Sequence, residues 1–214
     1  KINYLFEMST TKKWAIIIFT AALLARLLVF GALFEHSGEK GLILGDIRYL
    51  TLGQNLASGN GYTYEGLDAY RPPGYPAYLF IFDYLKLPLW MVSLVQIIIA
   101  SLIPLGIFMF AVRRTSLPQW AVLTAGFMAA FEPIQVFYSV VILPDVLFGA
   151  SFLISIFLLV LWMEKKSFRW AMYAGLSMGL TNYFRPTDIY FGVLGGAMLV
   201  VYFWWRKTLS KKVF

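Results

Sequence analysis

The sequence predicts an all-α membrane protein, a polytopic bundle of transmembrane helices. Of the 214 residues, 60% are hydrophobic and only 14% are charged, whereas soluble domains average about half apolar and a quarter charged. The mean hydropathy is +0.71. Apolar stretches near twenty residues recur along the chain, and each can cross a hydrocarbon core of about 30 Å at 1.5 Å per residue. This excludes a soluble globule and indicates a single membrane module over residues 1–214, with no soluble domain.

About six membrane spans are expected. They cover residues 14–34, 88–112, 120–131, 143–163, 170–184 and 189–205. The first run is too long for a signal-peptide core and lacks a small-residue cleavage site behind it, so it is expected to be retained. The third is interrupted at Glu132 and Pro133, since proline removes a helical hydrogen bond.

The distribution of cations predicts the orientation, because short cytoplasmic loops are enriched in Lys and Arg. With six spans, the side that carries both termini holds 12 of the 18 cations and the other side holds five. Both termini are therefore expected in the cytoplasm of an integral membrane protein. The membrane is the plasma or inner membrane, or that of the endoplasmic reticulum if the source is eukaryotic.

The remaining charges narrow the class of partner. The net charge of +7 comes from cations in short segments between apolar spans, which indicates membrane topology and not nucleic-acid binding. Nine of the 11 acids fall on the external side. A polar reaction site there would explain them, and the length of the external loop is the alternative. The absence of cysteine excludes a disulfide framework and a thiol nucleophile.

The only long loop is external, at residues 35–87, and a connection of about 50 residues is usually functional or separately folded. Within it, apolar residues from Tyr49 to Ala57 recur at spacings of three and four, which predicts a short amphipathic helix. That helix should lie along the membrane surface with Asp46 at its N-terminus. Gly59 and Gly61 should end it.

The second half of the loop contains Arg-Pro-Pro-Gly-Tyr-Pro at 71–76. Successive prolines fix φ and remove donors, so Arg71 to Gly74 cannot be helical. The segment is either part of a site or a stiff turn that re-enters the membrane at Tyr78.

Three strings of this loop, followed by motifs in the spans, resemble C-type glycosyltransferases. The strings are Gly-Asp-Ile-Arg-Tyr at 45–49, Asn-Leu-Ala-Ser-Gly-Asn-Gly-Tyr at 55–62 and the proline segment at 71–76. The similarity continues in order through Gln96, Arg113-Arg114, residues 133–139, Pro144-Asp145, 174–176 and 181–187. The branch that it resembles is that of the protein O-mannosyltransferases and the lipid A aminoarabinose transferases.

The resemblance implies a membrane glycosyltransferase. Such an enzyme moves a sugar from a polyprenyl-phosphate donor to a lipid, glycan or protein acceptor at the non-cytoplasmic face, and a carboxylate of the first loop acts as the base. Asp46 occupies that position, although many relatives carry two adjacent acids where Ile47 follows here. Without the resemblance, an Asp before a helix would be read as an N-cap.

The same chemistry needs cations for the departing phosphate. Arg71 and Arg185 are external arginines flanked by proline, and a guanidinium suits bidentate phosphate contact. Arg185 can instead snorkel toward headgroups. Arg26 lies within the first span and requires a partner, with Glu132 and the donor phosphate as candidates.

Asp145, Tyr49 and Tyr75 are expected to support the site by orienting the acceptor or a metal. Asp145 begins the fourth span and has a helix cap as its alternative role. If the loop and this span meet, Asp46 and Asp145 can bind Mg²⁺ or Mn²⁺; no cofactor is otherwise indicated. His36, the only histidine, has no cluster of metal-ligating residues around it in the sequence.

Two functions of other classes remain open. A transporter or lipid flippase would also use Arg26 and external acids. The second alternative is a catalytically silent subunit or a fragment, since proteins of the resembled family are commonly longer, with further spans and a soluble C-terminal domain.

Overall fold

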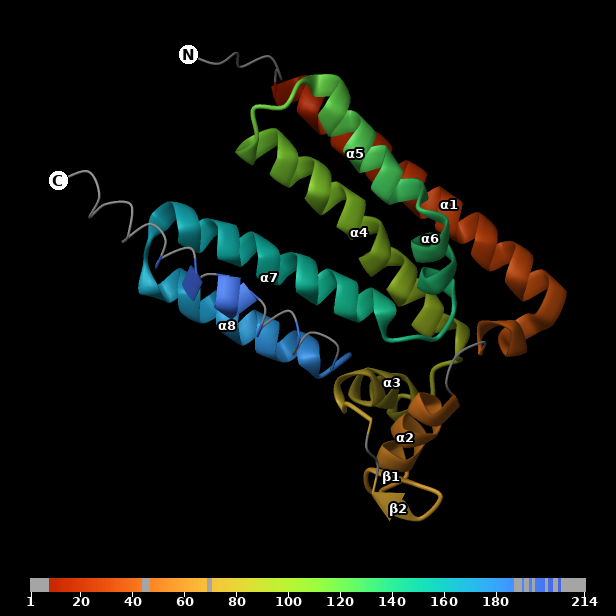
Figure 1. Ribbon diagram of the computed structural model, residues 1–214. Coiled ribbons are helices and arrows are strands. Elements are labelled where there is room, and N and C mark those ends of the chain that lie inside the picture. The colour runs from red at the N-terminus through yellow and green to blue at the C-terminus, as the bar shows by residue number, and fades with distance from the viewer. Residues whose placement is uncertain are drawn as a thin grey trace.

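The computed structural model describes residues 8–43, 47–68, 71–186 and, beyond these, 190, 193, 195–198, 200, 201 and 204. In this part of the chain, long helices form a bundle, and a smaller lobe lies at one of its ends (Figure 1). The bundle contains α1 (Met8–Leu42), α4 (Trp90–Arg114), α5 (Gln119–Phe131), α6 (Pro133–Val140), α7 (Asp145–Lys165) and α8 (Phe168–Asn182). The lobe contains α2 (Ile47–Ala57), β1 (Thr63–Tyr64), β2 (Leu67–Asp68) and α3 (Gly74–Tyr84). The predicted all-α class is confirmed apart from this short hairpin.

Three helices of the described part are long and apolar enough to cross a membrane. They are Thr10–Leu42, Trp90–Arg114 and Asp145–Lys165. A fourth span results if α5 and α6, which meet at an angle of 43°, cross together. The chain is therefore an integral membrane protein by the length and composition of its helices.

The predicted count of six is not confirmed. Helix α8 has 15 residues, so it is about 22 Å long at 1.5 Å per residue, short of a hydrocarbon core of about 30 Å. In the predicted span at 189–205, residues 189, 191, 192, 194, 199, 202, 203 and 205 lie outside the described ones. Its existence remains a prediction.

The break predicted at Glu132 and Pro133 is present, and it shows what Arg26 does. Glu132 caps α6, since its carboxylate accepts hydrogen bonds from the amides of Ile134 and Gln135. Arg26 is 1% exposed. Its Nη1 donates to the carbonyl oxygens of Ala22 at 2.9 Å and Ala130 at 3.0 Å. The interpretation of Glu132 as the partner of Arg26 was therefore wrong. The bend leaves carbonyl groups without helical N–H donors, and the guanidinium donates a hydrogen bond in their place.

We expect Arg26→Ala to lower the free energy of unfolding by roughly 2–4 kcal/mol, since it leaves a cavity and an unpaired carbonyl at the bend. Unfolding in a detergent series of rising sodium dodecyl sulfate fraction would measure this. Leu28→Ala on the same helix is the control, because Leu28 is 74% exposed. Equal midpoints for the two variants would contradict this role of Arg26.

Helix α1 continues beyond its predicted end at Phe34, so part of the expected loop 35–87 is helical. Gly38 bends it, with φ 57° and ψ −150°. Past the bend, the Glu39 carboxylate accepts from the amide of Trp90 at 3.4 Å. The Leu42 carbonyl accepts from the amide of Ile142 at 2.9 Å. The end of α1 thus connects the start of α4 and the segment before α7.

The predicted helix of the external loop is present as α2, and Gly59 and Gly61 follow it with positive φ. Its buried residues are Tyr49, Leu52 and Gly53. A Cβ on Gly53 would lie 2.9 Å from the Cβ of Leu79 in α3. The buried face of α2 therefore packs on α3, and its predicted place along the membrane surface remains a prediction.

The hairpin was not predicted. β1 and β2 are antiparallel, with Thr63 opposite Asp68 and Tyr64 opposite Leu67. Glu65 and Gly66, the two turn residues, both have positive φ, as in the tight hairpin turns that glycine favours. Asn55 holds the hairpin against α2, since its Nδ2 donates to the Thr63 carbonyl at 2.7 Å.

Candidate functional site

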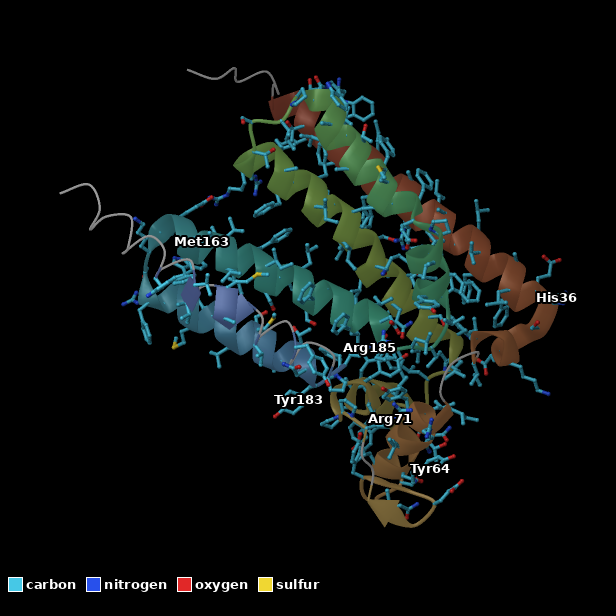
Figure 2. All side chains as sticks on the ribbon, viewed as in Figure 1. His36, Tyr64, Arg71, Met163, Tyr183 and Arg185 are labelled. Atoms are coloured by element: carbon cyan, nitrogen blue, oxygen red, sulfur yellow. The ribbon has the colours of Figure 1, made fainter. Side chains whose placement is uncertain are left out.

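The predicted site residues that the structure describes come together where the lobe meets the bundle. They are Tyr49, Arg71, Tyr75, Asp145 and Arg185. Figure 2 shows Arg71 and Arg185 at this end of the molecule, far from Met163 at the opposite end. We call these five residues the lobe–bundle cluster.

On the lobe side, Arg71 lies against two tyrosines. Its guanidinium carbon is 5.5 Å from the centroid of the Tyr49 ring, a cation–π distance. The Tyr62 hydroxyl donates to the Arg71 carbonyl at 2.6 Å. Burial, with a smaller contribution from Tyr49, raises the pKa of Tyr62 to about 12. Tyr62 therefore stays a neutral donor at physiological pH and holds the backbone of the proline segment.

Tyr75 connects the lobe to the core of the bundle. Its ring packs edge-on against Tyr49, with centroids 5.5 Å apart. Its hydroxyl donates to Gln96 Oε1 at 2.6 Å, and Gln96 Nε2 donates to the Val141 carbonyl at 2.8 Å. Burial is the main reason that the pKa of Tyr75 lies well above its usual value of 10, and the nearby Asp145 charge adds to it. Tyr75 is a buried structural donor and not a base.

On the bundle side, the Arg185 guanidinium forms an ion pair with the carboxylate of Asp145. The Arg185 side chain is 46% exposed and that of Asp145 is 15% exposed. Hydroxyl contacts further along the helices also join α7 to α8, since Ser155 Oγ lies 2.8 Å from Ser177 Oγ and 3.5 Å from Thr181 Oγ1. The pair thus presents an arginine to the solvent and keeps the carboxylate behind it.

The proline segment joins the two sides. The amide of Gly74 donates to the Tyr183 carbonyl at 2.7 Å, two residues before Arg185. A Cβ on Gly74 would lie 2.5 Å from that oxygen and 2.8 Å from the carbonyl carbon. Only glycine allows this approach. The segment is non-helical from Arg71 to Pro73, as predicted, but the prediction was wrong for Gly74, which begins α3 because its amide is free to bond outside the helix. The approach brings the backbone that carries Arg71 beside the backbone that carries Arg185.

Gly74→Ala is therefore expected to separate these two backbones and to lower stability by about 1–3 kcal/mol, since it overpacks against backbone atoms. Thermal unfolding in detergent would measure the loss. Gly31→Ala is the control, because a Cβ there meets nothing within 4 Å. A Gly74→Ala melting temperature equal to that of the control would contradict the close approach.

Two predictions about the site are not tested by this geometry. Asp46 lies outside the described residues. In the described part of the chain, no three His, Cys, Asp or Glu side chains gather as a metal would require. Asp145 alone does not fit a divalent cation, because its carboxylate is already paired with Arg185. No step is therefore assigned to a metal.

Two residues of this region were named in the sequence only as members of the resembling motifs and were given no role of their own. Gln96 links Tyr75 to Val141, and a polar side chain within an apolar span was a further signal. Tyr62, the last residue of the string at 55–62, holds the Arg71 carbonyl. Their contacts join segments that are distant along the chain.

The family is decided by a comparison with known proteins. A model of the dolichyl-phosphate-mannose-protein mannosyltransferase family matches residues 70–214. The chain belongs to this family. No curated protein and no solved structure matches it. The membership supports an enzyme of the mannosyltransferase-like glycosyltransferases, set in a membrane and supplied by a polyprenyl-phosphate sugar.

The part of the chain that matches the mannosyltransferase family includes most of the cluster. Arg71, Tyr75, Asp145 and Arg185 lie within residues 70–214, whereas Asp46 and Tyr49 precede them. The family match therefore agrees with the resemblance noted from the motifs at the level of the C-type glycosyltransferases.

Proposed function

We propose that the protein transfers a sugar from a polyprenyl-phosphate donor to an acceptor at the non-cytoplasmic face of the membrane. The lobe–bundle cluster holds the donor phosphate, and Asp46 is the base. The observation that supports this most is the approach of the Arg71 segment to the Arg185 segment at Gly74 and Tyr183. It brings two arginine-bearing backbones to one end of a membrane bundle.

The cluster has the properties that a phosphate site needs. A guanidinium offers two parallel donors to phosphate oxygens, and its charge persists at any physiological pH. Arg185 is half exposed, so a ligand can reach it. Asp145 pairs with Arg185, and Tyr49 packs against Arg71.

In the proposed reaction, an acceptor oxygen attacks the anomeric carbon of the sugar while the bond from that carbon to the phosphate oxygen breaks. Asp46 takes the acceptor proton. The negative charge that develops on the lipid phosphate is balanced by Arg71 and Arg185. A carboxylate within hydrogen-bond reach of the acceptor hydroxyl can serve as its general base.

The sequence connects Asp46 to this cluster. Asp46 directly precedes α2, and Tyr49, in the first turn of that helix, contacts both Arg71 and Tyr75. The place of Asp46 in the sequence, three positions before Tyr49, supports a role for it together with these arginines.

The predicted topology places this site outside the cytoplasm. The other end of the bundle holds the C-terminal ends of α4 and α7 and the start of α8 (Figure 1). The Arg114–Glu164 ion pair joins α4 to α7 there. That end carries Lys12, Lys13, Arg113, Arg114, Lys165, Lys166 and Arg169. The enrichment of cations at the cytoplasmic surface supports this orientation.

A transfer assay tests the proposal. The full chain, reconstituted in liposomes, would be incubated with polyprenyl-phosphate mannose labelled in the sugar and with extracts of lipid, glycan or protein acceptors. We expect labelled acceptor to appear with release of polyprenyl phosphate. Movement of labelled lipid between leaflets without transfer would indicate a flippase and overturn the proposal.

A further inference from the structure

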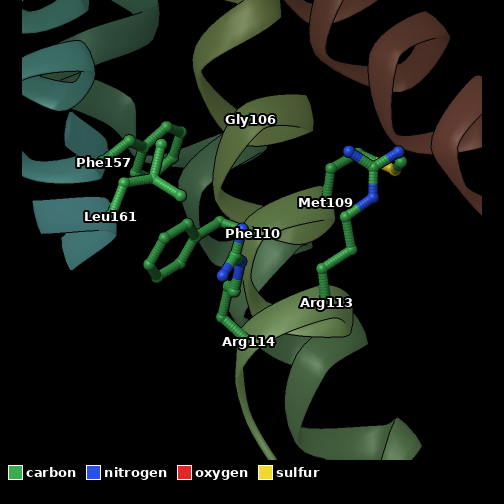
Figure 3. Close-up of a pocket in the computed structure, with 7 residues that line it drawn as sticks. All are labelled: Gly106, Met109, Phe110, Arg113, Arg114, Phe157 and Leu161. Atoms are coloured by element: carbon green, nitrogen blue, oxygen red, sulfur yellow. The ribbon is translucent and has the colours of Figure 1, made fainter. Parts of the chain in front are cut away.

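A groove between α4 and α7 lies at the bundle end opposite the lobe–bundle cluster. It is lined by Gly106, Met109, Phe110, Arg113, Arg114, Phe157 and Leu161, and its volume is about 230 Å³. Figure 3 shows Phe157 and Leu161 of α7 on one side of Phe110, Met109 and Arg113 on its other side, and both arginines beyond Phe110 along α4. Residues 106, 109, 110 and 113 lie on one face of α4, and 157 and 161 lie on one face of α7.

The shape of the groove follows from its sequence. Phe110 and Phe157 stack with their centroids 4.5 Å apart and form one wall. Gly106 leaves space beside them, since a Cβ there would lie 3.5 Å from Leu153 and Phe157 without a clash. The volume is below the 300–1,000 Å³ of sites for small molecules. An apolar slot of this kind suits one segment of an acyl chain.

The cations at the open end of the groove favour an anionic lipid headgroup. Four cations lie near this end of α4 and α7, namely Arg113, Arg114, Lys165 and Lys166. Arg114 pairs with Glu164, and Lys165 lies 4.9 Å from the Trp170 ring. Arg113 is exposed and, within the described residues, has no hydrogen bond or ion pair. A cation at a helix C-terminus is favoured by the dipole alone, but Arg113 also lines an apolar groove, a combination that matches a phosphate joined to an acyl chain.

We propose that this groove binds an anionic phospholipid of the surrounding bilayer, with the phosphate at Arg113 and an acyl segment beside Gly106, against the wall of Phe110 and Phe157. The site is separate from the proposed transfer site, because it lies at the other end of α4. The predicted topology places it in the cytoplasmic leaflet, which is rich in anionic lipids. The inference does not depend on transfer activity.

Native mass spectrometry of the full chain in detergent tests this with two lipids of identical acyl chains, phosphatidylglycerol and phosphatidylcholine. We expect the intact protein to bind phosphatidylglycerol about fivefold more tightly, the size of effect that one surface cation has on an anionic lipid. Arg113→Gln should reduce the preference to less than twofold. Arg169→Gln is the matched control, because it removes one exposed cation from the same end outside the groove.

Gly106→Leu provides a second arm, since it fills the groove without touching a charge. It should weaken binding of both lipids by at least threefold and leave their ratio unchanged. Equal affinity of the unaltered protein for phosphatidylglycerol and phosphatidylcholine would overturn the proposal. An equal loss of the preference in Arg113→Gln and Arg169→Gln would also overturn it, because the preference would then come from the charge of the whole surface. Unchanged binding in Gly106→Leu would overturn it as well, because the lipid would then lie outside the groove.

Discussion

Asp46→Asn is expected to lower the rate of sugar transfer by two to four orders of magnitude, the usual contribution of a general base. The amide keeps the shape of the side chain but cannot accept the acceptor proton. Binding of the donor should change little, because Asp46 does not hold the phosphate in the proposed site. The measurement is transfer from labelled polyprenyl-phosphate mannose under saturating donor, with donor binding followed separately.

The control for this variant is Glu65→Gln, which neutralises another loop acid at the turn of the hairpin, where φ is already positive. It should retain nearly full transfer. If Asp46→Asn also kept its activity, Asp46 would be a helix cap and the base would have to be sought elsewhere. If it lost donor binding together with transfer, its role would be structural.

Arg185→Gln is expected to weaken donor binding by roughly 10–100-fold, since a hydrogen bond to a charged group contributes about 1.5–3 kcal/mol. Asp145→Asn should leave donor binding unchanged or make it tighter, because it releases Arg185 from its ion pair. Each variant removes one of the two charges of this ion pair. Equilibrium binding of polyprenyl phosphate to the detergent-solubilised chain would measure both.

The signs of these two effects separate phosphate binding from simple structural pairing. If the ion pair only joined the start of α7 to the segment after α8, both substitutions would lower stability alike and neither would affect donor binding selectively. Lys86→Gln serves as the control for a general loss of positive charge, because Lys86 is exposed in the short connection after α3. A loss of binding in Lys86→Gln equal to that in Arg185→Gln would contradict a specific ligand role.

Local features of the structure were predictable from the sequence. The amphipathic spacing after Asp46 predicted α2, Pro133 predicted the bend between α5 and α6, and the prolines at 72 and 73 predicted a non-helical segment ahead of α3. Each of these depends on residues within a turn or two of one another. Periodicity and proline chemistry act at that range, so no tertiary contact was needed.

Other predictions failed where a distant contact replaced a local preference. Glu132 was a reasonable anionic partner for a buried arginine, yet it caps its own helix and Arg26 instead donates to the carbonyl of Ala130. Helix α1 passes its expected end because its bend at Gly38 lets Glu39 and Leu42 bond to α4 and to the segment before α7. Both outcomes depend on which helices are neighbours.

The sequence by itself determined that this protein is a helical membrane protein and pointed to its glycosyltransferase family, because hydropathy and ordered motifs are properties of the chain. The tertiary structure decided which of the candidate residues meet. Arg71 and Arg185 are 114 positions apart in the chain, and their backbones are brought together by one hydrogen bond that requires Gly74 to lack a side chain. Such an approach depends on the packing of α3 against the end of α8, which no local pattern encodes.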